Sequence, residues 1–352
     1  MRPATARPGD QTMHDYFFQT EVVRTALVVG VVVSILFYER VQLTTGGAIV
    51  PAYLAMFLPA PIFVVTTLVS AYLTYFIVSV VIAKRRILYG RRKFEVEMLV
   101  GLGFVAIGTG LTLLLRDDSP LYYGLSGIGF LVPGVIAHDM FRQGPRKTLL
   151  ALGATTTIVA LFVFVFASLL EISPAAGELP ELPSFDASTG YPLALILPAV
   201  VTSVVAGMFV FARTGLRSGG FITGAYLALV LPRPLDLLFT VVVASLTWFV
   251  VTRLVMPRLL IFGRRKLSTM VLIGAIVGWS AELLVRSLTD DAYVPWQGFI
   301  LVTLMVPALL ANDAQRQGLS RTAWGAAITT LAVFGTMNVL AAALGAAGVI
   351  ST

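Results

Sequence analysis

Residues 87–94 read ILYGRRKF and residues 261–267 read IFGRRKL, so one glycine-arginine-arginine-lysine segment occurs twice. Gly90 and Gly263 lie 173 positions apart, and other segments repeat at this spacing or at 174. The further matches are Gly46-Gly47 with Gly219-Gly220, Ala52-Tyr53-Leu54 with Ala225-Tyr226-Leu227, Pro133 with Pro307, Asp139 with Asp313, and Arg142-Gln143-Gly144 with Arg316-Gln317-Gly318. A register kept over this length predicts two copies of one structural unit.

The composition is that of a membrane protein. Of the 352 residues, 57% are hydrophobic and 12% are charged, whereas about a quarter of an ordinary soluble domain is charged. The apolar runs are long and lack the alternation of a membrane β-barrel, so helices must do the spanning. The chain has no cysteine and only two histidines, His14 and His138, so we expect no metal site and no cofactor. The sequence predicts an all-α polytopic integral membrane protein.

The sequence divides into four parts. We expect a disordered tail outside the cytoplasm at 1–21, a first membrane repeat at 22–171, and a second repeat at 192–352. The stretch between the repeats, 172–191, is acidic and rich in proline, and it reads as a linker outside the cytoplasm. No cleavable signal peptide is evident, because the first apolar run starts near Val22.

Each repeat is expected to cross the membrane six times, giving about twelve transmembrane segments. One segment in each repeat is too short for the roughly 20 residues of a full crossing, and it reads as a short or broken helix. The predicted segments are 22–38, 48–58 (short), 62–83, 95–115, 121–137 and 148–170 in the first repeat, and 192–211, 221–231 (short), 235–256, 268–288, 294–311 and 322–346 in the second. We also expect kinks at Pro133 and Pro307 and a polar loop at 138–147.

The positions of lysine and arginine predict the orientation. The basic segments 84–93, 142–147, 258–266 and 316–321 belong in the cytoplasm, and the acidic linker belongs outside. This alternation holds only if each short segment counts as a crossing. Both repeats then begin and end outside, so they are parallel repeats related by an axis along the membrane normal. We expect a multi-pass protein of the cytoplasmic membrane.

Three stretches of the first repeat resemble the membrane protein of bacterial poly-γ-glutamate synthesis, the PgsC/CapC family. They are ERVQLTTGGAIVPAYLAMFLPAP (39–61), ILYGRRKF (87–94) and GIGFLVPGVIAHDMFRQG (127–144), and the resemblance covers about 22–170. The second repeat keeps GRRK and RQG but has Gly224 for Pro51, Ala308 for Gly134 and Asn312 for His138. Family members are single copies, so the resemblance suggests that they work as dimers and that this chain fuses two protomers.

The resemblance implies a non-catalytic membrane subunit. It would anchor a cytosolic, ATP-dependent, Mur-ligase-like polyglutamate synthetase, possibly beside a further membrane-anchored subunit, and help pass the polymer outward. The sequence agrees that the chain is not the ligase, because it has no GxxxxGK[ST] phosphate loop. The stretch GLGFVA (101–106) mimics a dinucleotide fingerprint but lies within a predicted span, so it indicates helix packing through small residues. No nucleic acid is expected.

Two basic clusters are the first candidate site, for the polyanion or for the ligase. Arginine binds carboxylates in a bidentate manner, and polyglutamate offers one carboxylate per residue. Alternatively, these residues only orient the protein and contact anionic lipid. The candidates are Arg85, Arg86, Arg91, Arg92 and Lys93 in the first repeat and Arg264, Arg265 and Lys266 in the second.

The short helices are the second candidate site. Each follows a Gly-Gly pair on the predicted cytoplasmic side, and helix N-termini bind anions, so they are predicted to receive the carboxylates of the polymer. The alternative is that Gly-Gly only makes a tight turn. The residues are Arg40, Gly46 and Gly47 in the first repeat and Arg213, Arg217, Gly219 and Gly220 in the second.

A third group lies at the predicted cytoplasmic boundary. It consists of His138, Asp139 and Arg142 in the first repeat and Asn312, Asp313 and Arg316 in the second. A histidine-aspartate pair could relay protons, but the second repeat lacks the histidine, so capping or ligase docking is favoured.

Two other functions stay open. A secondary transporter for a small carboxylate would need buried ionisable residues for ion coupling, and the middles of the predicted spans are almost free of them. A scaffold would hold the ligase and conduct nothing.

Overall fold

The computed structural model describes residues 20–85, 87, 90–115, 128–172, 195–261, 263–296 and 300–346. All regular structure in these residues is helical. The predicted tail and linker lie almost wholly outside them. The chain forms two compact units, Met1–Gly177 (unit 1) and Glu178–Thr352 (unit 2), and the boundary between them falls within the predicted linker.

Unit 1 and unit 2 contain the same helices in the same order. In unit 1 these are α1 (Thr20–Val41), α2 (Val50–Met56), α3 (Pro61–Phe76), η1 (Ile77–Ile82), α4 (Ala83–Arg85), α5 (Gly90–Leu115), α7 (Val132–Gln143) and α8 (Pro145–Ile172). In unit 2 they are α10 (Ile196–Thr214), α11 (Thr223–Leu229), α12 (Pro234–Phe249), η4 (Val250–Val255), α13 (Gly263–Leu288), α14 (Ile300–Gln317) and α15 (Leu319–Ala346). The only difference is that α4 has no separate counterpart among the described residues of unit 2.

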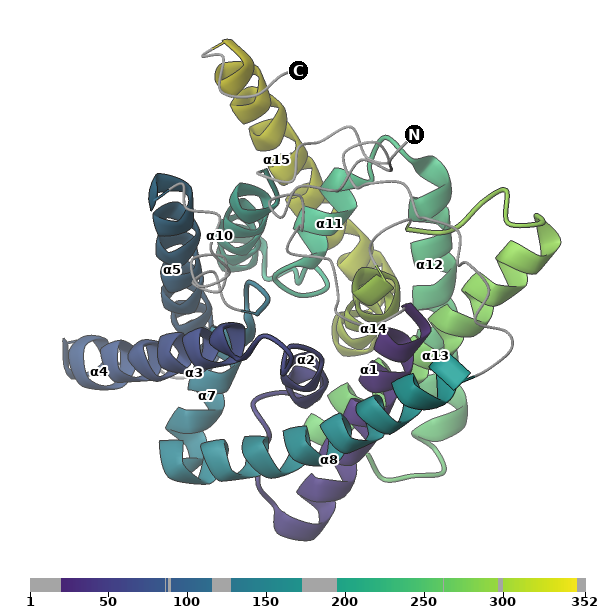
Figure 1. Ribbon diagram of the computed structural model, residues 1–352. Helices are drawn as coiled ribbons and strands as arrows, with labels where there is room; N and C mark the ends of the chain where they lie inside the picture. The colour runs from purple at the N-terminus through teal and green to yellow at the C-terminus, as the bar shows by residue number, and fades with distance from the viewer. Residues whose placement is uncertain are drawn as a thin grey trace, which may run out of the picture. The chain divides into compact units, whose positions relative to one another are not determined.

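The helices of each unit pack as two groups of three. In unit 1, α8 packs along α1 and α2, and α7 packs against α3 and α5 (Figure 1). In unit 2, α15 packs in the same way along α10 and α11, and α14 packs against α12 and α13 (Figure 1). The two groups of a unit are joined where α7 meets α8 and where α14 meets α15.

Among the described residues, eight helices are long and apolar enough to cross a membrane, as expected of a polytopic membrane protein. They are Val22–Val41, Pro61–Arg85, Gly90–Leu111 and Pro145–Leu169 in unit 1 and Ile196–Thr214, Pro234–Val255, Arg265–Leu288 and Leu319–Ala346 in unit 2. The short helices α2 and α11 have seven residues each. At about 1.5 Å per residue each is about 10 Å long, a third of the hydrocarbon thickness, so neither crosses the membrane alone. The count of twelve therefore remains a prediction.

The predicted polar loop at 138–147 is wrong. Helix α7 continues to Gln143, and α8 begins at Pro145. The single residue between them, Gly144, has a φ of 89° and ends α7, and Gly318 does the same between α14 and α15 with a φ of 92°. The predicted kink at Pro133 is also wrong, because this proline lies in the first turn of α7, where no backbone N–H is needed, while Pro307 does lie inside α14.

A π-helical segment interrupts the same helix of each unit. It covers η1 in unit 1 and η4 in unit 2, and the two segments begin 173 positions apart, at Ile77 and Val250. A six-residue π-segment is rare in proteins, and its occurrence at one register in both units shows that the repeat extends to backbone detail.

Candidate functional site

Three segments meet at one end of each unit, which we call the basic end. In unit 1 the basic end comprises residues 40–47, 90–97 and 138–147, and in unit 2 it comprises 213–220, 263–270 and 312–321. These are the three groups of candidate residues that the sequence predicts separately. Their contact within each unit agrees with a location on one side of the membrane, which stays a prediction.

A glycine pair forms a buried turn at each basic end. Gly46 and Gly47 have φ values of 71° and 112°, and Gly219 and Gly220 have values of 82° and 104°. Side chains at such φ values are strained, and a Cβ at Gly46 would lie 2.9 Å from Ile136. The turn therefore needs glycine for its conformation and for its close packing.

A buried aspartate binds each turn. The Gly46 N–H donates to Asp139 Oδ2 at 3.0 Å, and the Gly219 N–H donates to Asp313 Oδ2 at 3.1 Å. Asp139 is 2% exposed and Asp313 is 8% exposed. The turn was predicted to bind carboxylates of the polymer, but one of its N–H groups already donates a hydrogen bond to an aspartate carboxylate of the same chain. The binding role of the remaining turn residues stays a prediction.

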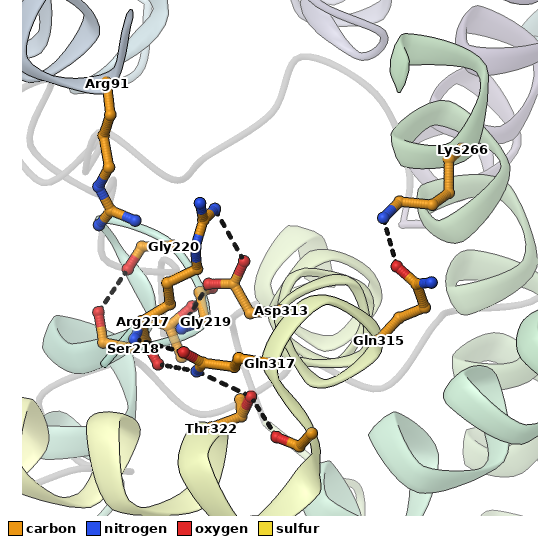
Figure 2. A network of polar contacts seen from close by, with 12 residues as sticks. Arg91, Arg217, Ser218, Gly219, Gly220, Lys266, Asp313, Gln315, Gln317 and Thr322 are labelled. Carbon is orange, nitrogen blue, oxygen red and sulfur yellow. Dashed lines mark hydrogen bonds and ion pairs between the residues drawn. The ribbon is translucent and has the colours of Figure 1, made fainter. Parts of the chain in front are cut away.

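A glutamine ties the segment before each turn to the following helix. In unit 1 the Gln143 Oε1 accepts from the Thr44 N–H at 2.9 Å, while its Nε2 donates to the Thr44 carbonyl at 2.6 Å and to Thr148 Oγ1 at 3.0 Å. In unit 2 Gln317 makes the same three bonds, at 2.9, 2.8 and 3.0 Å, with Arg217 and Thr322 (Figure 2). Every polar atom of each amide side chain is used, so the repeated glutamine has a structural role.

The first turns of α5 carry a buried charged group in unit 1. Glu97 is 1% exposed. Its Oε1 forms an ion pair with Lys93 Nζ at 3.5 Å, and its Oε2 lies 2.6 Å from His138 Nδ1. Lys93 also lies over the ring of Phe141. Two residues earlier, Glu95 accepts from Arg91 Nε at 2.7 Å. The partner of His138 is thus Glu97 on another helix, and not the adjacent aspartate considered in the sequence analysis.

Unit 2 has a different arrangement at the matched positions. Lys266 Nζ donates to the neutral side-chain carbonyl of Gln315, and Arg217 Nη1 lies 3.9 Å from Asp313 Oδ1 (Figure 2). Met270 stands where unit 1 has Glu97, and Asn312 stands where it has His138.

The other predicted residues lie on or near the surface of their units. The exposed ones are Arg40, Arg85, Arg92, Arg142, Arg213, Arg265 and Arg316. Arg86 and the side chain of Arg264 lie outside the described residues. Binding of polymer, ligase or lipid by these arginines remains a prediction.

Sequence reasoning missed the two clamping glutamines and the two buried glutamates of unit 1. The glutamines belong to the repeated RQG motif, but only the arginine of this motif was a candidate residue. The glutamates gave no signal, because unit 2 has Ser268 and Met270 in their places.

Comparisons with known proteins find one family in both repeats. The family model described as Capsule biosynthesis CapC matches residues 29–149 and 202–323. The chain is 37% identical over 145 residues to the capsule biosynthesis protein CapC of Bacillus anthracis, an alignment that covers 39% of this chain and 93% of that protein. It is 33% identical over 144 residues to the PGA biosynthesis protein CapC of Bacillus subtilis strain 168, covering 40% of this chain and 95% of that protein.

No solved structure matches the chain. Each relative corresponds to less than half of this chain although it is aligned over nearly its whole length, as a tandem duplication requires. The resemblance noted from the sequence is confirmed, and because the two matches together span more than half of the sequence, the chain belongs to the CapC family of capsule biosynthesis proteins.

Proposed function

We propose that this protein is a non-catalytic membrane subunit of a complex that synthesises and exports poly-γ-glutamate. The observation that carries this proposal is the pair of CapC matches, since the relatives are named for capsule and PGA biosynthesis. The protein would sit in the cytoplasmic membrane. One chain would supply the two units that single-copy relatives would supply as a dimer.

The proposed partner is a cytosolic, ATP-dependent amide ligase that joins glutamates, possibly with a further membrane-anchored subunit. The basic ends support this assignment, because they gather arginine and lysine from three segments at one end of each unit. A ligase that releases a polyanion at this end would place its product against positive charge. The protein would anchor the ligase and help pass the polymer outward.

Deletion of the gene tests the proposal. We expect extracellular poly-γ-glutamate to disappear, to return when the full chain is supplied from a plasmid, and the ligase to co-purify with the tagged chain in mild detergent. Normal polymer in the deletion strain would contradict the proposal. Polymer uptake or release by vesicles that hold the purified complex separates a conducting subunit from a scaffold.

A secondary transporter of a small carboxylate is the second candidate. The observation that favours it is the burial of Arg24, Asp236 and Glu282 within helices long enough to cross the membrane. Arg24 and Asp236 lie within five residues of a helix start, and Glu282 lies in the last third of α13, so none of them marks the middle of a span. Uptake of labelled glutamate by vesicles that contain the chain alone would support this function over the first.

A further inference from the structure

The buried face of α8 carries threonines, and α15 carries them at the same positions. Three threonines of α8 are less than a tenth exposed, and so are the three residues of α15 that match them at a spacing of 174. They are Thr148, Thr155 and Thr156 in unit 1 and Thr322, Thr329 and Thr330 in unit 2. Farther from the basic end the buried face is apolar, beginning with Val159 in α8 and Val333 in α15. The hydroxyl groups thus occupy one stretch of the face, which starts at the basic end.

The innermost pair, Thr156 and Thr330, lies in the middle of the membrane spans. Thr156 follows Pro145 by 11 positions, and Thr330 follows Leu319 by 11 positions. The two spans begin at Pro145 and Leu319. At about 1.5 Å per residue, both threonines are about 16 Å into the membrane, which is half of the hydrocarbon thickness. Lipid offers no hydrogen-bonding partner at this depth, so each hydroxyl depends on the protein or on water.

Most threonine hydroxyls in these helices bond to their own helix. The Thr155 hydroxyl donates to the Ala151 carbonyl at 2.8 Å, and the Thr157 hydroxyl donates to the Gly153 carbonyl at 2.9 Å. This bond to a carbonyl one turn earlier satisfies a hydroxyl where the surroundings supply no other partner.

The hydroxyls of Thr156 and Thr330 do not use this bond. Both oxygen atoms are buried, and neither has a hydrogen-bond partner among the described residues. The buried hydroxyl of Thr329 also has none within that part of the chain. Buried hydroxyls without a protein partner are rare, and ordered water is their usual partner. The repetition at matched positions of two units with different sequences argues against chance.

Further hydroxyl groups lie beside these threonines in unit 2. Helix α15 packs along α10 and α11. A Cβ at Gly224 of α11 would lie 2.7 Å from Thr329 Cγ2 and 2.8 Å from Ser203 Oγ, so these two side chains are neighbours. At the basic end, the Thr322 hydroxyl accepts from Gln317 Nε2 at 3.0 Å. Hydroxyl groups of α10 and α15 therefore follow one another from the basic end to the middle of the span.

We infer that each unit holds water in the middle of the membrane, in a hydroxyl-lined site on α8 in unit 1 and on α15 in unit 2 that is open to the basic end. Neutral hydroxyls suit water, which both donates and accepts hydrogen bonds, whereas a buried ion needs charged partners. The polar stretch ends at Thr156 and Thr330, so water enters from the basic end and not from the opposite one. A polar polymer needs wetted protein surface of this kind to cross a bilayer, but the inference does not depend on the proposed function.

Cysteine accessibility tests the inference, because the chain has no cysteine of its own. Thr156→Cys and Thr330→Cys put a thiol in place of each hydroxyl with little change in size. The matched controls Val159→Cys and Val333→Cys carry the thiol on the same face, at fully buried positions about one turn farther from the basic end. Lys147→Cys, at an exposed position of the basic end, reports full access. Gel filtration and apparent melting temperature check that each full-length variant is folded.

Each purified variant is placed in nanodiscs, where both membrane surfaces are accessible, and treated with the charged reagent methanethiosulfonate ethylsulfonate. The thiolate attacks the sulfenyl sulfur of the reagent, so a mixed disulfide forms and methanesulfinate leaves. Mass spectrometry gives the rate of modification. Thr156→Cys and Thr330→Cys should react at least about tenfold faster than the valine controls, because a thiol in dry, apolar surroundings ionises poorly. All variants should react completely after unfolding in sodium dodecyl sulfate.

Rates at positions 156 and 330 no faster than those of the valine controls would overturn the inference. Fast modification at only one of the two positions would also overturn it, because the inference assigns a site to each unit. Thr155→Cys and Thr329→Cys, one position nearer the basic end, are second reporters if a first variant does not fold, and they should also react faster than the controls. The labelling needs neither ligase nor polymer, so its failure leaves the proposed function to be judged by the deletion strain.

Discussion

At the residue scale, the glycine turns show how the repeat conserves a bond while it changes the residue that makes it. In unit 1 the Ser34 hydroxyl donates to the Ala48 carbonyl at 3.0 Å, and in unit 2 the Ser203 hydroxyl donates to the Phe221 carbonyl at 2.6 Å. The two carbonyls occupy matched positions, but the two serines do not. Ser203 matches Gly30, one helical turn earlier than Ser34. A buried carbonyl must be satisfied, and either turn of the preceding helix can satisfy it.

The glutamine clamp gives a prediction at this scale. Gln143→Glu should lower the apparent melting temperature in detergent, because it loses the two Nε2 bonds and puts a carboxylate oxygen against the Thr44 carbonyl. Leaving buried acceptors unsatisfied costs about 1–3 kcal/mol. Gln42→Glu is the matched control, since this exposed glutamine donates only one long bond, 3.3 Å, to the Glu39 carbonyl. Equal melting temperatures for the two variants would mean that the clamp does not stabilise the turn.

At the element scale, helices approach closely where small residues face one another. A Cβ at Gly101 of α5 would lie 2.7 Å from the Gly134 backbone nitrogen of α7, and a Cβ at Gly274 of α13 would lie 2.7 Å from Ala308 of α14. The same pair of helices thus meets through small residues in both units. The predicted packing role of the GLGFVA stretch is confirmed for Gly101 and not for Gly103, which has open space beside it.

These two glycines of α5 provide the second prediction. Gly101→Ala should destabilise the protein by about 1–3 kcal/mol, because backbone atoms of α7 cannot move aside for the added methyl group. Gly103→Ala should leave the apparent melting temperature unchanged or raise it slightly, because alanine favours the helix and meets no atom within 4 Å. Both variants are compared with the wild type by thermal unfolding in one detergent. A Gly103→Ala loss as large as that of Gly101→Ala would mean that helix propensity or lipid contact, and not close packing, governs α5.

At the scale of the whole molecule, the chain is two similar units whose matching reaches from element order to single hydrogen bonds. Both units keep the glutamine that binds the segment before the glycine turn. They differ in nearby charged residues, since Glu95 and Glu97 of unit 1 are replaced by Ser268 and Met270 in unit 2. The fold and the charge of the basic end are therefore independent properties of the repeat. A fused pair can specialise one unit, whereas a symmetric dimer of a single-copy protein carries the same residues in both subunits.

Parallel orientation of the two units is the third prediction. The chain has no cysteine, so a single introduced cysteine can be labelled without background. We expect a membrane-impermeant maleimide to label Asp291→Cys in intact cells, and to label Lys84→Cys and Arg258→Cys only after the membrane is permeabilised. All three native side chains are exposed. Labelling of positions 84 and 258 from opposite sides would exclude parallel repeats and the twelve-segment topology with them.

The sequence by itself determined the duplication, the helical membrane class and the family. These properties are local or periodic: long apolar runs specify helices in a membrane, and a fixed spacing of 173 or 174 residues needs no folded structure to be seen. The sequence also marked most residues of the basic ends. It misplaced the end of α7, because the polar run that it read as a loop is helical up to Gly144.

Only the tertiary structure decided how those residues are used. The bonds of Asp139 to Gly46, of Gln143 to Thr44 and of His138 to Glu97 join positions 93, 99 and 41 residues apart. A local sequence pattern describes one helix at a time. It cannot predict such pairs, because each bond joins two segments that come together only when the helices pack. For the same reason the pairing of the buried glutamates of unit 1 became visible only when the structure placed them beside Arg91 and Lys93.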